Sequence, residues 1–346
     1  MTRSPAIMLV LAASVVAAHR PALAQDSYAG RQITLIVGSA SGGGYDQLAR
    51  LMARHMVRHI PGNPVMIVQN MPAAGSIAAA NHLFKVAAKD GTVIGVMQRS
   101  VLLAPITNPG GVQYDLAKFN WLGSLNSETG VVLAMSAGTH KTTRDLFERE
   151  LIVGANSNAD PELSAKIYNA LIGTRFKIVT GYSGTPAIQL AMERGEVAGI
   201  ADWSWSSVKN QKPEWLRTNK IVALLQGALQ RDRELPDLAN ALDFVKTATD
   251  RRVMELYFAQ KTVARPVLAP PGIPADRLAL LRAALARLAS DHDFLADAEK
   301  QKLEVGPITG EAVDRVIGLV TTQPPEVIAR FKTALGTGSS EGGAAQ

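Results

Sequence analysis

The chain has 346 residues, 47% of them hydrophobic, a formal net charge of +6 and no cysteine. The lack of cysteine excludes disulfide bonds and thiolate chemistry, and the mild charge, without a dense lysine and arginine block, excludes a nucleic-acid partner. The length is typical of about two domains, each with its own hydrophobic core.

Residues 1–24 are predicted to form a secretory signal peptide. Arg3 gives the positive start, residues 6–18 form an apolar run, and Ala22-Leu23-Ala24 is a small-x-small cleavage site. The apolar run is too short to span a membrane. We therefore expect cleavage after Ala24 and export of the mature chain to the periplasm.

The first element of the mature chain is predicted to be a buried strand over Ile33–Val37, which runs into a glycine-rich loop. Gly42, Gly43 and Gly44 leave the backbone without Cβ atoms, so that a ligand can approach the main chain closely. From Tyr45 onwards, apolar residues recur at helical spacing. The free N–H groups and the dipole at such a helix start favour an anion.

The same loop lacks the sequence of the common nucleotide sites. A phosphate-binding P-loop needs Gly-Lys-Ser/Thr, whereas Gly44 is followed by Tyr45 and Asp46. The glycine spacing also does not fit the dinucleotide pattern G-x-G-x-x-G. Asp46 is interpreted as a helix cap or as a brace for the loop. The loop therefore predicts a small-anion site, with a plain strand-to-helix turn as the alternative.

Strands and helices are predicted to alternate along the rest of the chain. Strands over 65–69 and 93–97 are separated by helices over 47–59 and 76–87, which favours a mostly parallel sheet covered by helices. A polar break at 126–130 is interpreted as a hinge. The later predicted elements are 120–125, 131–135, 151–155, 163–171, 177–180, 186–194, 197–202, 221–225, 263–270 and 275–289.

This order predicts an α/β fold of two lobes, joined by two hinge crossings, with a ligand cleft between them at the strand ends. We assign residues 25–125 and 249–335 to the first lobe and residues 126–248 to the second. Residues 336–346 are rich in glycine, serine and alanine and are predicted to be disordered.

Three further loops place small polar residues before predicted helices. Asn70–Ser76 ends in a potential helix cap, and Tyr182–Pro186 is a similar turn in the second lobe. In Ala155–Pro161, the asparagine and serine side chains can donate hydrogen bonds to carboxylate oxygens. An ordinary loop with a capping serine is the alternative for Asn70–Ser76.

The sequence offers no catalytic or metal-binding constellation. His55 and His59 have a spacing that can hold a metal, but Met56 stands where a zinc protease needs glutamate. We interpret both histidines as residues of a solvated helix face. The chain lacks a G-x-S-x-G nucleophile elbow. Trp203 and Trp205 are interpreted as packing residues, with a place in the cleft lining as the alternative. We expect no catalytic residue, no metal and no cofactor.

Taken together, these segments resemble the substrate-binding proteins of tripartite tricarboxylate transporters, also called Bug or TctC-like receptors. The resemblance rests on the order of the motifs and extends over about residues 30–330. The chain differs from the family in lacking the usual proline before the glycines of the first loop and in having a polar insert near 230–252. The matching segments are Ile33–Asp46, Asn70–Ser76, Asp90–Thr92, Tyr182–Pro186, Gly195–Val197 and Ala269–Pro274.

The resemblance implies a type II-like periplasmic binding protein that closes on a small organic carboxylate and delivers it to integral membrane permease subunits. We expect a monomer that is not an enzyme. The alternatives are an exported sensor and a cleft hydrolase or isomerase, and the sequence leaves open whether Arg265 reaches the cleft. The residues that the resemblance assigns to ligand binding are Ser39, Ala40, Ser41, Gly42, Gly43, Gly44, Tyr45, Asp46, Ala73, Ala74, Gly75, Ser76, Asn156, Ser157, Asn158, Tyr182, Thr185 and Asp202.

Overall fold

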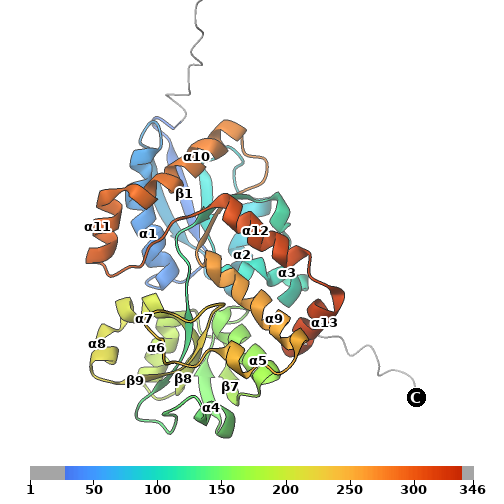
Figure 1. Ribbon diagram of the computed structural model, residues 1–346. Coiled ribbons are helices and arrows are strands. Elements are labelled where there is room, and N and C mark those ends of the chain that lie inside the picture. Colours follow the sequence, from blue (N-terminus) through green and yellow to red (C-terminus); the bar gives the residue numbers. More distant parts are fainter. Residues whose placement is uncertain (1–27, 337–346) are drawn as a thin grey trace, which may run out of the picture.

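A computed structural model of the chain describes residues 28–336 (Figure 1). The predicted signal peptide, its cleavage site after Ala24 and the predicted tail beyond Gly336 lie outside the described residues. Within residues 28–336, no helix has the length and apolar character needed to cross a membrane.

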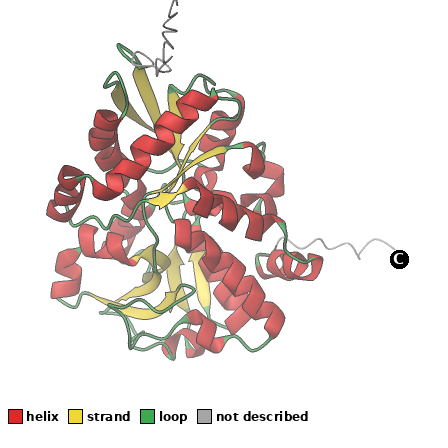
Figure 2. Cartoon of the chain, turned by 45° about the horizontal axis from the view of Figure 1, so that its top comes forward, coloured by secondary structure: helices red, strands yellow, loops and turns green. Residues whose placement is uncertain are grey.

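The strands form two separate sheets, each flanked by helices (Figure 2). The first sheet has six strands in the order β11-β4-β10-β3-β1-β2. Strands β1, β2 and β3 run parallel, as the alternating sequence predicts, whereas β10 runs antiparallel to both of its neighbours, β3 and β4. The strands are β1 (Gln32–Val37), β2 (Val65–Asn70), β3 (Val93–Val96), β4 (Asn120–Ser124), β10 (Pro266–Ala269) and β11 (Ile308–Thr309).

Helices cover this first sheet and connect its strands. The crossovers between the parallel strands are α1 (Gly44–Met56) and α2 (Ile77–Lys85). The further helices of this lobe are α3 (Ala104–Thr107), α10 (Ala275–Arg287), α11 (His292–Lys300) and α12 (Gly310–Thr321).

The second sheet has five strands in the order β7-β6-β8-β5-β9. Its strands are β5 (Gly130–Met135), β6 (Leu151–Gly154), β7 (Phe176–Val179), β8 (Gly199–Ser204) and β9 (Ile221–Gly227). The helices around it are α4 (Asp145–Glu148), α5 (Asp160–Ile172), α6 (Thr185–Glu193), α7 (Trp205–Gln211) and α8 (Pro213–Arg217).

The chain crosses from the first lobe to the second after β4. It returns to the first lobe after β9 (Figure 1). The returning segment forms α9 (Ala248–Ala259), and the last helix is α13 (Pro325–Ala334). Helix α13 packs against α9 and also against α5 of the second lobe. The C-terminal helices thus support one side of the junction between the two lobes.

Helix α1 shows how the hydrophobic pattern places the glycine-rich loop. Leu48, Leu51, Met52 and Met56 are all fully or almost fully buried against the first sheet. Burying each such side chain contributes about 1.5–3 kcal/mol relative to leaving it exposed. This packing fixes the N-terminus of α1, and with it the loop, at the end of β1.

The interpretation of His55 and His59 as solvated residues is wrong. His55 is buried, with its Nε2 2.9 Å from an Asp297 carboxylate oxygen, and His59 lies 2.6 Å from Asp291. Both aspartates belong to the α11 region, so the histidines form part of the contact between α1 and α11. Asp291 also caps α11 by accepting a hydrogen bond from the backbone of Phe294.

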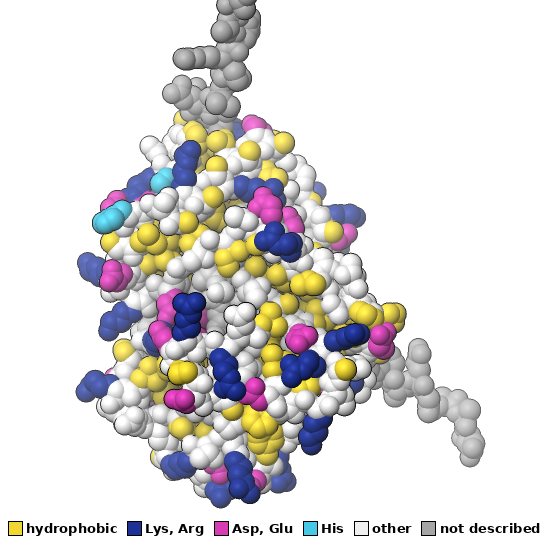
Figure 3. Space-filling model, viewed as in Figure 1, with side chains coloured by type: hydrophobic (Ala, Val, Ile, Leu, Met, Phe, Trp, Pro, Cys, Tyr) yellow, Lys and Arg dark blue, Asp and Glu magenta, His cyan; other side chains and the backbone are white. Residues whose placement is uncertain are grey.

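Charges of both signs are mixed on one face of the molecule. On the face drawn in Figure 3, lysine and arginine side chains are interspersed with aspartate and glutamate. That face carries no continuous basic patch of the kind that tracks a phosphate backbone.

Candidate functional site

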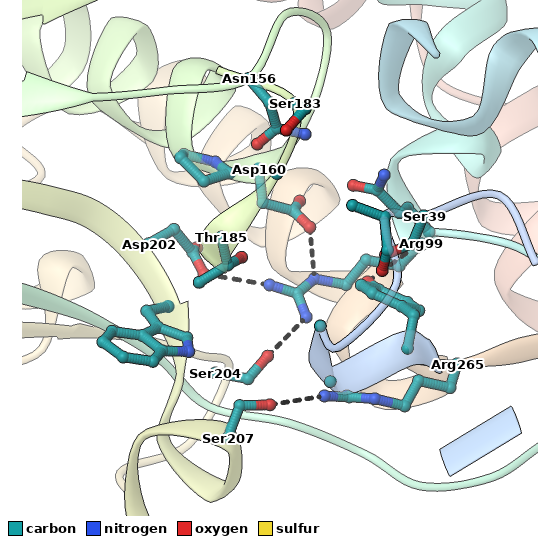
Figure 4. Close-up of a pocket in the computed structure, with 18 residues that line it drawn as sticks. Ser39, Arg99, Asn156, Asp160, Ser183, Thr185, Asp202, Ser204, Ser207 and Arg265 are labelled. Carbon is teal, nitrogen blue, oxygen red and sulfur yellow. Dashed lines mark hydrogen bonds and ion pairs between the residues drawn. The ribbon is translucent and has the colours of Figure 1, made fainter. Parts of the chain in front are cut away.

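A small cavity lies between the two lobes, with a volume of about 50 Å³ (Figure 4). Its first-lobe wall comes from the ends of β1 and β3 and from the start of α1, and its second-lobe wall comes from the starts of α5 and α6 and the end of β8. Residues at the N-termini of three helices, α1, α5 and α6, therefore line one space. Free N–H groups and helix dipoles converge there on any bound anion.

The structure brings eight of the sequence-predicted residues to the cavity wall. They come from the first glycine-rich loop and from three separate segments of the second lobe. These residues are Ser39, Ala40, Gly43, Gly44, Tyr45, Asn156, Thr185 and Asp202. Ser41, Gly42, Asp46, Ala73, Ala74, Gly75, Ser76, Ser157, Asn158 and Tyr182 are not part of the wall.

Asp46 braces the first loop from behind the wall. Its carboxylate accepts hydrogen bonds from Gly42 N and Asn70 Nδ2, both at 2.9 Å, and from Arg50 Nε at 3.0 Å. Burial acts to raise the pKa of Asp46, but the hydrogen bonds from Arg50, Gly42 and Asn70 outweigh it and lower that pKa below its ordinary value. The carboxylate therefore stays ionised and holds the loop in shape.

The second loop makes a contact between the lobes instead of lining the cavity. Gly75 has a φ of +62°, and a Cβ added there would overlap the carbonyl oxygen of Asn158 in the second lobe. Ser76 Oγ donates to Gly38 O at 2.5 Å and accepts from Gln98 N at 2.9 Å, which ties this loop to the ends of β1 and β3.

Arg99, which the sequence analysis did not single out, lies at the centre of the cavity wall (Figure 4). It follows β3 in the first lobe and reaches two carboxylates of the second lobe. Its Nε is 3.1 Å from Asp160 Oδ2, and its Nη2 is 3.0 Å from Asp202 Oδ1. Its Nη1 donates to Ser204 Oγ at 3.3 Å. One buried guanidinium thus joins the two lobes.

Arg265 also reaches the cleft, which settles the question that the sequence left open. Its Nη1 is 2.8 Å from Glu128 Oε1, and its Nη2 donates to Ser207 Oγ at 3.2 Å. Its guanidinium lies over the ring of Tyr45, 4.9 Å from the centroid. It therefore lines the same cavity as Arg99 while being held by groups from both lobes.

The charges in and behind this wall balance. Three cations, Arg99, Lys261 and Arg265, face three carboxylates, and all of these side chains are at least nine-tenths buried. The carboxylates are Asp160, Asp202 and Glu128. A structure that buries charges in this way must pair them, because an unpaired buried charge is strongly unfavourable.

Three buried N–H groups of the wall lack a hydrogen-bond acceptor. They are Nε of Arg99, Nε1 of Trp203 and Nε of Arg265. The Arg99 Nε lies close to Asp160 but without hydrogen-bond geometry. Buried donors normally have acceptors, and here all three orphaned groups are donors around one cavity. The described residues thus leave three buried donors at this wall without a hydrogen-bond acceptor.

Among the wall residues that the sequence analysis did not single out, Arg99 has a signal in its position. Arg99 comes two residues after the predicted strand that ends at Met97, and the ends of neighbouring parallel strands meet at the ligand cleft. A charged residue at that position is therefore a candidate on placement alone. No histidine lines the cavity, and no group of three potential ligand side chains within residues 28–336 is placed to hold a metal ion.

No family model and no curated protein matches the sequence. Several solved structures share the fold. The periplasmic binding protein BugD matches with a TM-score of 0.70 and 20% identity, over 89% of this chain and 98% of that one. MatC from Rhodopseudomonas palustris with bound malate matches with a TM-score of 0.65 and 20% identity, over 88% of this chain and 98% of that one. Rpa4515 of R. palustris with adipate matches with a TM-score of 0.65 and 19% identity, over 89% of this chain and 97% of that one. The predicted two-lobe binding-protein fold is confirmed, as is the predicted likeness to Bug-type receptors at the level of the fold.

Proposed function

We propose that this chain is a substrate-binding protein of the tripartite tricarboxylate transporter type, which captures a small organic carboxylate in the cleft between its lobes. The observation that carries this proposal is the set of unpaired donors on Arg99, Trp203 and Arg265 around one inter-lobe cavity. The three helix N-termini at the same wall add main-chain donors and favourable dipoles for an anion.

The ligand class follows from the distribution of these donors. The start of α1 at Gly44 and the guanidinium groups of Arg99 and Arg265 line the same cavity, and Gly44 lies close to Arg265. We expect an acid with two carboxylates to use both kinds of donor. Malate and adipate, which MatC and Rpa4515 hold, are acids of this class and are suitable first ligands to test.

Several features favour binding over catalysis. The structures with the same fold are binding proteins. The cavity wall has donors for an anion, but it has no histidine that could act as a base for a nucleophilic serine. We propose that the mature chain works in the periplasm as a monomer and transfers its ligand to integral membrane permease subunits. Closure of the two lobes around the acid would present the loaded form to that partner.

A thermal-shift panel of organic acids tests the proposed function. A ligand that binds only the folded state stabilises it by about 2.7 kcal/mol at a hundredfold excess over Kd. We expect malate, adipate or a related di- or tricarboxylate or aromatic acid to raise the melting temperature. The neutral diamide of the best acid is the matched control and should have no effect, because it lacks the anionic oxygens. A panel without any stabilising acid would contradict the proposal.

A further inference from the structure

The closed cleft has too little room for an organic acid as it stands. Its volume of about 50 Å³ holds a few water molecules, whereas ligand pockets usually measure about 300–1,000 Å³. Arg99 extends across the space to Asp160 and Asp202 on the opposite lobe. A ligand that enters must therefore separate these groups and share Arg99 with at least one of the two carboxylates.

The charge balance makes this sharing costly for an anion alone. The buried cluster already pairs three cations with three carboxylates, so a further carboxylate would leave excess negative charge out of contact with water. A proton taken up by one buried carboxylate removes that excess. The three candidates for this proton are Asp160, Asp202 and Glu128.

The hydrogen bonds distinguish the three carboxylates. Asp202 accepts from Lys261 Nζ at 2.5 Å, Ser164 Oγ at 2.8 Å and Arg99 Nη2 at 3.0 Å. Glu128 accepts from Asn126 Nδ2 at 2.8 Å and pairs with Arg265 at 2.8 Å, with Ser206 as a further donor.

Asp160 is held far less well. It has the Arg99 contact at 3.1 Å without hydrogen-bond geometry, and its two hydrogen bonds, from Tyr257 and Gln260, are 3.4 and 3.5 Å long. These lengths are at the limit of a hydrogen bond, so the ionised form of Asp160 is the least stabilised of the three.

We propose that the cleft takes up its organic acid together with one proton, and that Asp160 is the residue that receives this proton. One ligand carboxylate replaces Asp160 beside the Arg99 guanidinium, and a proton from the buffer adds to the Asp160 carboxylate, so the charge of that ligand carboxylate is balanced within the cluster. The second carboxylate of a diacid takes up no proton and is stabilised by main-chain N–H groups and the dipole at the start of α1. The inference rests on the proposed function, because it needs an anionic ligand in this cleft.

The charged and titratable groups around Asp160 agree with this assignment. Among the surrounding groups, Arg99 and Lys261 act to keep Asp160 ionised, whereas Asp202 opposes its ionisation. Three tyrosine hydroxyls, those of Tyr45, Tyr168 and Tyr257, also lie in its electrostatic surroundings. Burial raises the pKa of Asp160 above its ordinary value despite Arg99. For Asp202, burial also acts to raise the pKa, but Lys261 and Arg99 outweigh it and lower that pKa.

Calorimetric titration with malate in buffers of different ionisation enthalpy tests the inference. At about pH 7 carboxylic acids are ionised in solution, so proton uptake reports on the protein. We expect the apparent binding enthalpy to vary linearly with the buffer enthalpy, with a slope close to one proton per malate. By linkage, affinity then falls up to tenfold for each unit of pH increase. If malate does not bind, adipate or the best acid of the thermal-shift panel takes its place.

Two variants locate the proton. Asp160→Asn keeps the size of the side chain but cannot ionise, so we expect binding without proton uptake and with little dependence on pH. Asp90→Asn, at an exposed turn of the first lobe, is the matched control and should take up protons as the wild-type protein does.

The outcomes separate the inference from the proposed function. Acid binding with a buffer-independent enthalpy in the wild-type protein overturns the inference and leaves the function intact. Proton uptake that persists in Asp160→Asn overturns the assignment to Asp160. If Asp160→Asn does not fold, the wild-type slope still decides whether a proton is bound. Absence of binding by every acid overturns the proposed function and the inference with it.

Discussion

Arg99→Met is expected to lower the free energy of unfolding by about 3–5 kcal/mol and to abolish binding of malate and adipate. The change leaves Asp160 and Asp202 buried with Lys261 as the remaining cation in contact with Asp202. It also removes one of the three unpaired donors that a ligand carboxylate would satisfy. Chemical denaturation measures the first effect and calorimetry the second.

The dependence on pH has a defined sign in this variant. Without Arg99, burial of Asp160 raises its pKa further above the value in the unfolded chain, so the folded state binds the proton more tightly. Stability of Arg99→Met should therefore increase as the pH falls through the folded-state pKa of Asp160 towards the ordinary pKa of an aspartate.

Two further variants complete this test. Adding Asp160→Asn to Arg99→Met should restore part of the lost stability, because it removes one unpaired buried charge. Arg144→Met, which removes the exposed partner of Glu148 in α4, is the control and should cost no more than about 1 kcal/mol. Equal losses in Arg144→Met and Arg99→Met would contradict the central role of Arg99.

Gly75→Ala is expected to weaken ligand binding by roughly 5- to 150-fold while leaving each lobe folded. A Cβ at Gly75 would overlap the carbonyl oxygen of Asn158, but only when the lobes are closed, since the two residues belong to different lobes. Overpacking of this kind costs about 1–3 kcal/mol, which reduces the population of the closed, binding-competent form. Calorimetry gives the affinity, and small-angle scattering should show a less compact particle with ligand present.

Gly195→Ala is the matched control for backbone strain. Gly195 also has a positive φ, +75°, but open space surrounds the position of an added Cβ. Both variants carry similar strain, so a difference in affinity between them reports the contact between the lobes. Unchanged affinity in Gly75→Ala would show that closure at this contact is not required for binding.

The sequence predicted those features of the fold that depend on local patterns. The strand at 33–37, the glycine-rich loop and the apolar spacing of α1 follow from residues close in sequence, and all three are present. The antiparallel insertion of β10 between β3 and β4 could not be predicted from local patterns. The residues that pair β10 with β4 lie more than 140 positions apart in the chain.

The part of the candidate site that the glycine-rich loop forms could be predicted from the sequence. The part that long-range ion pairs form could not. The loop at Gly43 and Gly44 lines the cavity and carries a recognisable glycine pattern. Arg99 has no such pattern, since its significance depends on Asp160 and Asp202, which lie 61 and 103 positions further along. The two histidines were misjudged for the same reason, because their partners Asp291 and Asp297 lie in a distant helix region.

A crystal structure of the protein grown with the acid that gives the largest thermal shift tests the central claim most directly. We predict closed lobes with one ligand carboxylate within about 2.7–3.2 Å of the Arg99 guanidinium and the other beside the backbone N–H groups of the glycine-rich loop. A carboxylate bound outside the inter-lobe cavity, or held in it without contact to Arg99, would contradict the account.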